Sequence, residues 1–201
     1  MTKIGIFGGS FDPIHFGHIY LAMQAKDEAE LDRIIFVPAN LQPFKLDRKA
    51  TDGRHRAEMI ELSVQNYDGA IVSPYELNRD EVSYTVNTLR HFRDEFGNSA
   101  EIYFITGTDA FLKIDTWKNA DEILSGYSFI IGSRPGYRDD ELKAKIDELK
   151  SKYGCNIIVV HNTQIDVSST ELREKLKNGE SVKDYINPKV ERYIQENGLY
   201  K

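Results

Sequence analysis

The feature that most constrains this fold is a regular alternation of strand-like and helix-like segments along residues 3–161. Short apolar runs such as "KIGIF" and "RIIFVP" are typical of buried strands, and most are followed by a segment with apolar residues at helical spacing. Such alternation indicates βαβ units, which build a doubly wound α/β domain with a mostly parallel sheet covered by helices on both faces. The expected strands are 3–7, 33–38, 70–76, 101–107, 127–134 and 155–161, and the expected helices are 16–30, 54–67, 84–96 and 140–154.

The alternation stops after the last expected strand. Two short helices, at 168–179 and 189–198, follow each other with no strand between them. Because the chain has 201 residues and no linker-like or repetitive tract, the sequence predicts a single domain over residues 1–201. We expect residues 1–165 to form the α/β core and residues 166–201 to form a small C-terminal helical extension.

Composition narrows the classes of partner. The net charge of −6 argues against a nucleic-acid-binding surface along the whole chain, and no apolar run approaches the roughly 20 residues of a membrane helix. The sequence starts directly in a strand pattern, so we expect no signal peptide. The one cysteine, Cys155, cannot form an internal disulfide and is expected to be a packed thiol, which fits a reducing compartment. These observations predict a cytoplasmic protein without nucleic-acid or membrane partners, and they leave a homo-oligomer open.

The stretch "GGSFDPIHFGH" at residues 8–18 directly follows the first expected strand. Ligands of parallel sheets bind beyond the carboxyl ends of the strands, so this stretch lies where a site is expected. Its two glycines lack Cβ atoms and let the backbone approach a ligand closely. A helix is expected to start near Phe16, with unpaired N–H groups and its positive dipole end directed toward the same place. His15 and His18 are three residues apart, so both rings can share one face of the first turn.

Three interpretations of residues 8–18 compete: a structural turn, a metal site and a phosphate site. The stretch is not a Walker loop, because no Gly-Lys-Ser/Thr follows, and its glycine spacing differs from G-x-G-x-x-G. A metal site would need a third ligand, and zinc helices usually space histidines four apart. Glycines, a helix N-terminus and two imidazoles all suit an anion, so the phosphate interpretation is favoured. The other histidines, His55, His91 and His161, show no partner pattern and are interpreted as surface residues.

The segment "DVSSTELREKL" follows the last expected strand and opens a helix. Ser168, Ser169 and Thr170 offer hydroxyls and N-cap geometry, and Arg173 lies one turn later. A helix N-terminus, hydroxyls and a guanidinium together form a good anion cradle. From the residues alone, this anion cradle and an ordinary helix cap followed by a surface arginine are equally favoured.

Other segments carry single candidate residues. In "GTDAF", Gly107 permits close approach of a ligand, and Asp109 can accept from a ribose hydroxyl or cap the next helix. A lone tryptophan is usually a core residue, but Trp117 lies in the polar "DTWKN", so we expect its ring to be partly exposed. Lys45, in a long loop, and Arg134, at the end of a strand, are either solvated cations or phosphate contacts.

Taken together, these segments resemble a known family. "GGSFDPIHFGH" looks like the opening motif of the nucleotidyltransferase superfamily with the (H/T)-x-G-H signature. Two positions depart from the family pattern: Phe44 stands where the family often has the histidine of Pro-His-Lys, and two residues separate Tyr185 from Pro188 where it often has Tyr-x-Pro. The resemblance covers nearly the whole chain, because six further segments follow in the order seen in bacterial nicotinate-nucleotide adenylyltransferases: "VPANLQPFK", "ELNRDEVSYTVNTL", "FITGTDAFLKIDTW", "SRPGY", "DVSSTELREKL" and "VERYIQENGLY".

The resemblance implies a Rossmann-like fold and a reaction. The adenylyl group of ATP would pass to nicotinate mononucleotide, giving deamido-NAD and pyrophosphate, with Mg²⁺ bound through the ATP phosphates and no metal ligands from the protein. It implies that His15, His18 and Arg173 are catalytic, that Gly8, Gly9, Ser10, Phe11, Gly107, Asp109, Ser168, Ser169, Thr170 and Arg173 bind ATP, and that Lys45, Tyr84, Thr85, Trp117 and Arg134 bind the nicotinate nucleotide.

The resemblance also implies a preference for the acid over the amide. Backbone at Thr85, at the start of the helix over 84–96, would contact the pyridine carboxylate, and Trp117 would stack on the ring. Two other interpretations stay open: an adenylyltransferase of the same superfamily that acts on phosphopantetheine or nicotinamide mononucleotide, and a non-catalytic nucleotide-binding module.

Overall fold

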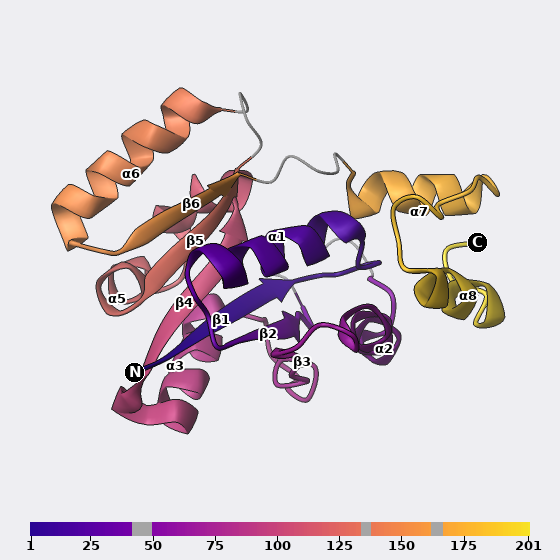
Figure 1. Ribbon diagram of the computed structural model, residues 1–201, viewed down its shortest axis with the longest axis horizontal. Helices are drawn as coiled ribbons and strands as arrows, with labels where there is room; N and C mark the ends of the chain where they lie inside the picture. The colour runs from indigo at the N-terminus through magenta and orange to yellow at the C-terminus, as the bar shows by residue number, and fades with distance from the viewer. Residues whose placement is uncertain (42–49, 134–137, 162–166) are drawn as a thin grey trace.

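The computed structural model describes residues 1–41, 50–133, 138–161 and 167–201. Within these residues, six strands form one sheet in the order β3-β2-β1-β4-β5-β6, and all of its pairings are parallel (Figure 1). The expected doubly wound parallel sheet is therefore confirmed, with its switch in strand order between β1 and β4. The strands are β1 (Thr2–Gly9), β2 (Arg33–Pro38), β3 (Ala70–Val72), β4 (Ala100–Gly107), β5 (Ser128–Ser133) and β6 (Ile157–His161).

Two clusters of buried side chains cover the two faces of the sheet. Successive residues of β2 alternate between them: Ile34 and Phe36 belong to one cluster, and Ile35 and Val37 to the other. Because both faces are covered, the strands are almost entirely apolar, as the sequence pattern indicates. The helices are α1 (Phe16–Glu28) and α2 (Gly53–Val64) on the first face, and α3 (Thr85–Phe96), α5 (Ala120–Gly126) and α6 (Asp139–Tyr153) on the second.

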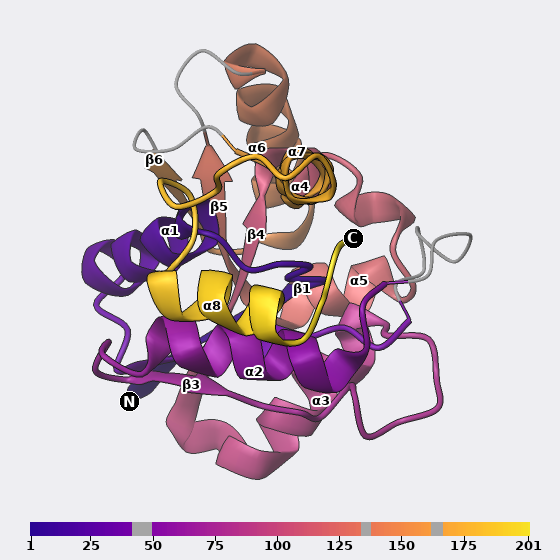
Figure 2. The same ribbon diagram turned by 90° about the vertical axis from the view of Figure 1, so that its right-hand side faces the viewer.

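The C-terminal segment contains α7 (Ser169–Lys177) and α8 (Pro188–Glu196). Figure 2 shows α8 lying along α2, and the two helices are in contact. Val190 and Ile194 of α8 join the same buried cluster as Met59 and Ile60 of α2. This shared cluster supports a single domain over residues 1–201, which stays a prediction.

The short helices differ most from the sequence-based expectation. The chain between β4 and β5 forms α4 (Thr108–Phe111), a 3₁₀ turn at Ile114–Thr116 and α5, where the apolar spacing predicts no helix. Segments of 4 and 7 residues are too short to repeat an apolar stripe, so the pattern cannot reveal them. Strand β3 ends at Val72 and not at residue 76, and Pro74, just beyond, has no N–H to donate to a sheet. None of the helices in the described part of the chain is long and apolar enough to cross a membrane.

Candidate functional site: a nucleotide-sized cavity at the carboxyl edge of the sheet

A cavity of about 1690 Å³ opens beyond the carboxyl ends of β1, β4 and β5. This is the crevice in which doubly wound sheets bind their ligands, next to the switch in strand order. It brings together segments that lie far apart in the sequence, as the sequence motifs predict. Its lining includes Gly8, Gly9, Ser10, Phe11, His15, His18, Gly107, Ser168, Ser169, Thr170 and Arg173.

The two histidines of the opening motif form a stacked pair at the start of α1. Their ring centroids lie 3.7 Å apart, at an interplanar angle of 28°. The backbone N–H of His15 donates to Nδ1 of His18 at 3.3 Å. Because Nδ1 accepts, the neutral His18 ring carries its proton on Nε2. An edge-on contact with Phe11, at 5.1 Å between centroids, also orients the His18 ring.

His15 is the buried member of the pair. Only 7% of it is exposed, and this burial lowers its pKa from 6.5 to about 4, against the opposing effect of the Glu171 carboxylate. His15 is therefore a neutral imidazole at pH 7, with one N–H donor. Its Nδ1 has no hydrogen-bond partner among the described residues. A buried ring nitrogen of this kind is ready for a ligand atom.

The start of α1 corrects one expectation. The N–H of Phe16 donates to the carbonyl of Tyr185 at 2.8 Å, and the N–H of His18 donates to the carbonyl of His15 at 2.9 Å. Unpaired N–H groups near Phe16 were expected, and for these two groups the expectation is wrong. For Phe16 the reason is tertiary, because the segment before α8 supplies the carbonyl. For His18 it is local, because the carbonyl belongs to the residue three positions earlier.

Helix α7 begins with a capping box. The N–H of Glu171 donates to Oγ of Ser168 at 3.2 Å, and the N–H of Ser168 donates to Oε2 of Glu171 at 2.8 Å. Ser168 is thus an ordinary N-cap, the alternative that the sequence left open. The cap also fixes the helix N-terminus at the cavity wall, so capping and anion binding are compatible roles for this segment.

The rest of the α7 start is tied to the opening motif. Ser169 Oγ donates to the carbonyl of Pro13 at 3.0 Å. Arg173 donates through Nη1 to the carbonyl of Asp12 and through Nη2 to Oγ1 of Thr170, the latter at 2.8 Å. The guanidinium is therefore part-buried in the cavity wall and is not a simple surface arginine.

Arg56 on α2 is a cavity residue that the sequence analysis missed. It is only 2% exposed, and its guanidinium donates to three backbone carbonyls: those of Ser10 and Ala39, each at 2.7 Å, and of Thr51, at 2.8 Å. Burial lowers its pKa, while Asp12 and other anionic groups oppose that effect. Arg56 thereby joins the loop after β1 to the segments after β2 and before α2.

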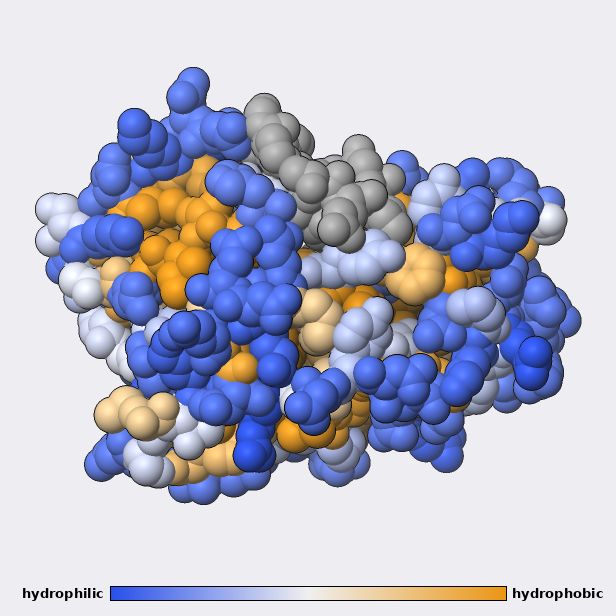
Figure 3. Space-filling model, viewed as in Figure 1, coloured by the Kyte–Doolittle hydropathy of each residue, from blue (hydrophilic) through white to orange (hydrophobic). Residues whose placement is uncertain are grey.

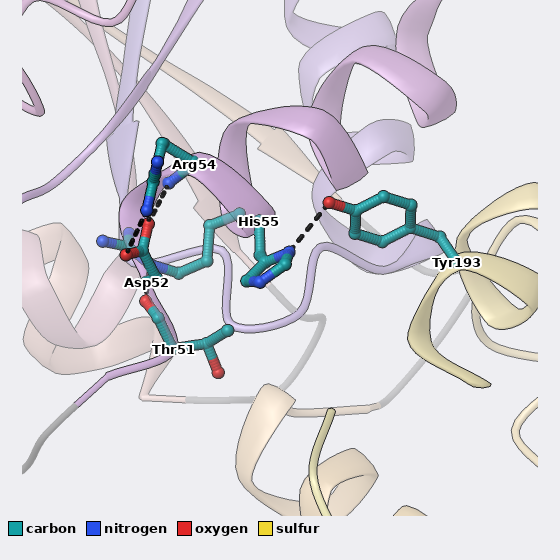
Figure 4. A network of polar contacts seen from close by, with 6 residues as sticks. Thr51, Asp52, Arg54, His55 and Tyr193 are labelled. Carbon is teal, nitrogen blue, oxygen red and sulfur yellow. Dashed lines mark hydrogen bonds and ion pairs between the residues drawn. The ribbon is translucent and has the colours of Figure 1, made fainter. Parts of the chain in front are cut away.

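The sequence does contain a pattern that indicates burial of Arg56. It shares a helical face with Ile60, four residues on, so a charged residue occupies a core position of an apolar stripe. Its neighbour Arg54 behaves differently: that side chain is 92% exposed and pairs with Asp52 at 3.3 Å (Figure 4).

Comparisons with known proteins agree with this geometry. The cytidylyltransferase-like family model matches residues 6–175. A protein of Clostridium botulinum (strain Alaska E43) named probable nicotinate-nucleotide adenylyltransferase is 39% identical over 201 residues, which cover 100% of this chain and 99% of that protein. A protein of the same name from Thermoanaerobacter sp. (strain X514) is 40% identical over 199 residues, 99% of this chain and 94% of that one.

The chain belongs to the nicotinate-nucleotide adenylyltransferase family. It is thus a nucleotidyltransferase. Among solved structures, the Plasmodium falciparum nicotinic acid mononucleotide adenylyltransferase complexed with NaAD matches 100% of this chain and 98% of its own, with a TM-score of 0.80 at 22% identity. This likeness supports the Rossmann-like fold.

Of the residues that the family resemblance assigns to the pyridine nucleotide, Tyr84, Thr85 and Trp117 lie in the described part of the chain, and none of these three lines the large cavity. Tyr84 and Trp117 both pack against the buried cluster beneath α3. The Trp117 ring is half-buried and meets Phe104 edge-on, at 5.8 Å between centroids, so the expected partial exposure is confirmed. The ammonium of Lys118 lies 4.2 Å from the centre of the Tyr84 ring. Thr85 is the first residue of α3.

Asp109 lies in the first turn of α4, and the N-cap of this helix is Gly107. Its Oδ1 accepts from Nη1 of Arg138 at 3.1 Å, in an exposed ion pair.

The remaining expectations from the sequence concern single residues. Lys45, Phe44 and Arg134 fall outside the described residues. His55 and His91 are both partly exposed, and each has a partner that the sequence pattern does not show: the Tyr193 hydroxyl lies 2.8 Å from Nδ1 of His55, and the His91 ring stacks on Tyr75 with 3.9 Å between ring centroids. Cys155 is buried, as expected of a packed thiol, and this burial raises its pKa.

Proposed function

We propose that this protein transfers the adenylyl group of ATP to nicotinate mononucleotide, forming deamido-NAD and pyrophosphate. The observation that carries the proposal is the convergence of the loop after β1, the stacked histidines and the start of α7 with Arg173 on one cavity. Glycine-lined backbone, imidazoles and a guanidinium are the groups that bind phosphates. The names of the relatives support the choice of substrates.

The chemistry asks for positioning and charge stabilisation. A 5′-phosphate oxygen of the acceptor attacks the α-phosphorus of ATP in line, so that one P–O bond forms while the bond to the leaving pyrophosphate breaks. The attacking phosphate is already mostly ionised at pH 7, and a strong general base is not required. We assign the stabilisation of the phosphoryl oxygens to His15, His18 and Arg173, and the binding of ATP to Gly8–Phe11 and Ser168–Thr170.

The low pKa of His15 defines what this residue supplies. Burial keeps its ring neutral near pH 7, so it donates a hydrogen bond to a phosphate oxygen without contributing a positive charge. Full positive charge at the site then comes from Arg173, which stays protonated at every working pH. An anionic ligand would raise the pKa of His15 and strengthen the same contact.

We propose that Mg²⁺ is bound at this site through the ATP phosphates. The described residues contain no group of three or more His, Cys, Asp or Glu side chains that could hold a metal ion. Mg²⁺ prefers phosphate oxygens and water, so we propose that it enters bound to ATP. When bound, it neutralises part of the charge on the leaving pyrophosphate. The protein's own contribution is to hold the phosphates through the loop after β1 and through Arg173.

We assign the acceptor side to Tyr84, Thr85, Trp117, Lys45 and Arg134. Thr85 opens α3, and early helical N–H groups favour a carboxylate over a carboxamide. An amide there would place its NH₂ group against other donors, which costs roughly 1–3 kcal/mol, or about 5–150-fold in specificity. The net charge of −6 and the buried Cys155 support a cytoplasmic enzyme that acts on these nucleotides and not on nucleic acid.

Pyrophosphate release from ATP with a panel of acceptors tests the proposal. We expect release with nicotinate mononucleotide, much less with nicotinamide mononucleotide, and none with phosphopantetheine. Release with phosphopantetheine alone would assign the enzyme to another branch of the superfamily. ATP binding without release for any acceptor would indicate a non-catalytic nucleotide-binding module.

A further inference from the structure

Residues 12 and 200 meet in the folded chain, although they lie near its opposite ends. The hydroxyl of Tyr200 donates to Oδ1 of Asp12 at 2.6 Å. We propose that Tyr200 is a positioning residue for adenylyl transfer: its hydroxyl holds Asp12, and Asp12 in turn holds the loop after β1 and Arg173. This inference rests on the proposed function, because it assigns a role to a residue in that reaction.

Asp12 is a buried connecting point. It is 4% exposed and lies within the opening motif, at the cavity wall. Its Oδ1 accepts from Tyr200, and its Oδ2 accepts from the N–H of Thr51 at 3.4 Å. Its carbonyl accepts from Nη1 of Arg173, the guanidinium assigned to the ATP phosphates. One residue therefore connects three segments of the chain at the cavity.

The fold delivers Tyr200 to this position through α8. Val190 and Ile194 anchor α8 on the core. After the helix ends, the N–H of Leu199 donates back to the carbonyl of Ile194 at 3.0 Å, and Gly198 has a φ of 61°, the arrangement of a helix C-cap. The turn directs the next residue toward Asp12.

Tyr200 itself adopts a strained backbone conformation. Its φ is also 61°, in the left-handed region that a bulky residue rarely occupies. Such strain persists only where surrounding contacts hold it, and it is concentrated at functional sites. The contact that holds it here is a half-buried tyrosine hydroxyl on a buried carboxylate.

Loss of the hydroxyl would act on ATP through Asp12. A buried carboxylate that loses a hydrogen bond seeks another donor, and the nearby charge of Arg56 attracts it. Arg56 already uses its guanidinium on the carbonyls of Ser10, Ala39 and Thr51. Competition for Arg56 would loosen the loop after β1, and a displaced Asp12 carbonyl would move Arg173.

Tyr193→Phe is a matched control for Tyr200→Phe. Tyr193 also lies in the C-terminal segment and also uses its hydroxyl across the fold, on Nδ1 of His55 at 2.8 Å. Figure 4 shows that contact between α8 and α2. It docks the same segment but does not touch Asp12, so it reports on docking alone.

The test is steady-state kinetics of full-length Tyr200→Phe, with ATP and nicotinate mononucleotide varied separately. We expect kcat/KM for ATP to fall on the order of tenfold, the loss typical of one hydrogen bond to a buried charge. KM for nicotinate mononucleotide should stay within about twofold, since Arg173 and the loop act on ATP. Tyr193→Phe should keep the kcat/KM of the unaltered protein.

A double-mutant cycle with Asp12→Asn keeps the proposal testable if Tyr200→Phe is less stable. The two substitutions should be strongly non-additive in kcat/KM for ATP. Additive effects, unchanged kinetics in Tyr200→Phe, or an equal loss in Tyr193→Phe would each overturn the proposal. Its failure is distinct from failure of the proposed function, in which the unaltered protein releases no pyrophosphate with nicotinate mononucleotide.

Discussion

The two sides that we propose for the site, a phosphate side at the loop after β1 and a pyridine side at Tyr84, Thr85 and Trp117, are built differently. On the proposed phosphate side, side chains from distant elements hold three backbone carbonyls of one loop: Arg56 holds that of Ser10, Arg173 that of Asp12, and Ser169 that of Pro13. On the pyridine side, the described contacts are between rings and a cation, such as Trp117 against Phe104. The loop after β1 is thus held in place by the protein's own side chains, whereas the proposed pyridine side presents partly exposed rings; if the assignment holds, the first side is organised before ATP binds.

The largest effect should come from the histidine pair. His18→Ala is expected to lower kcat by at least about 10²-fold, the scale of losing one transition-state donor. His15→Ala should behave similarly. Pyrophosphate release measures this, with His161→Ala, an exposed histidine on β6, as the control. Near-normal turnover in a well-folded His18→Ala protein would mean that the phosphate side is not where catalysis occurs.

Burial of His15 should make stability depend on pH. Folding lowers its pKa from 6.5 to about 4, so the unfolded chain binds more protons in that interval and stability is lost as the pH falls through it. The shift corresponds to about 3 kcal/mol. Urea unfolding at pH 7 and at pH 4 should therefore show a smaller loss in His15→Gln than in the unaltered protein. Equal losses would place His15 in a more solvated environment; exposed His161→Gln is the control.

Two substitutions at Thr85 distinguish recognition of the pyridine carboxylate by the backbone N–H from recognition by the side-chain hydroxyl. Thr85→Pro removes the N–H at the first position of α3 together with the side-chain hydroxyl. Proline is well tolerated there, and the extended Tyr84 suits a following proline. This substitution should reduce the preference for nicotinate over nicotinamide mononucleotide by about 5–150-fold. Thr85→Ala, which keeps the N–H, should change the ratio of kcat/KM values little. A large change in Thr85→Ala would indicate recognition by the hydroxyl.

Arg56→Lys weakens the connection between loops but keeps the charge. A lysine ammonium cannot reproduce the fork that reaches three carbonyls. We expect kcat/KM for ATP to fall about tenfold, together with a lower melting temperature. Arg90→Lys, which alters an exposed ion pair with Glu122, should leave both unchanged. If the two variants behaved alike, the backbone on the phosphate side would not depend on Arg56.

Trp117→Ala should have the smallest effect. Loss of one stacking surface is expected to raise KM about 3- to 10-fold for nicotinate and nicotinamide mononucleotides alike, because stacking does not distinguish acid from amide. KM for ATP should not change. An effect confined to one acceptor, or an effect on ATP, would contradict the division of the site into two sides.

Local patterns in the sequence predicted most of the fold. The strands and long helices follow from apolar spacing, and the loop after β1 follows from its glycines and histidines at the end of a strand. The short α4 and α5 were missed, because 4 and 7 residues do not complete a periodic stripe. The N-cap role of Ser168 and the site role of Arg173 could not be separated, since the same residues suit both.

By itself, the sequence determined the parallel α/β architecture, the position of the loop after β1 for which we propose phosphate binding, and the residue types in that loop, because all of these depend on neighbours within a few residues. Only the tertiary structure decided which charged groups are buried and what they hold. In the sequence, Arg56 is one of several charged residues of a helix. In the structure, its guanidinium donates to three carbonyls from separate segments. Asp12 and Tyr200 are 188 residues apart, and no local pattern reports a contact that forms only when α8 packs on α2 and brings the end of the chain to the start of the site.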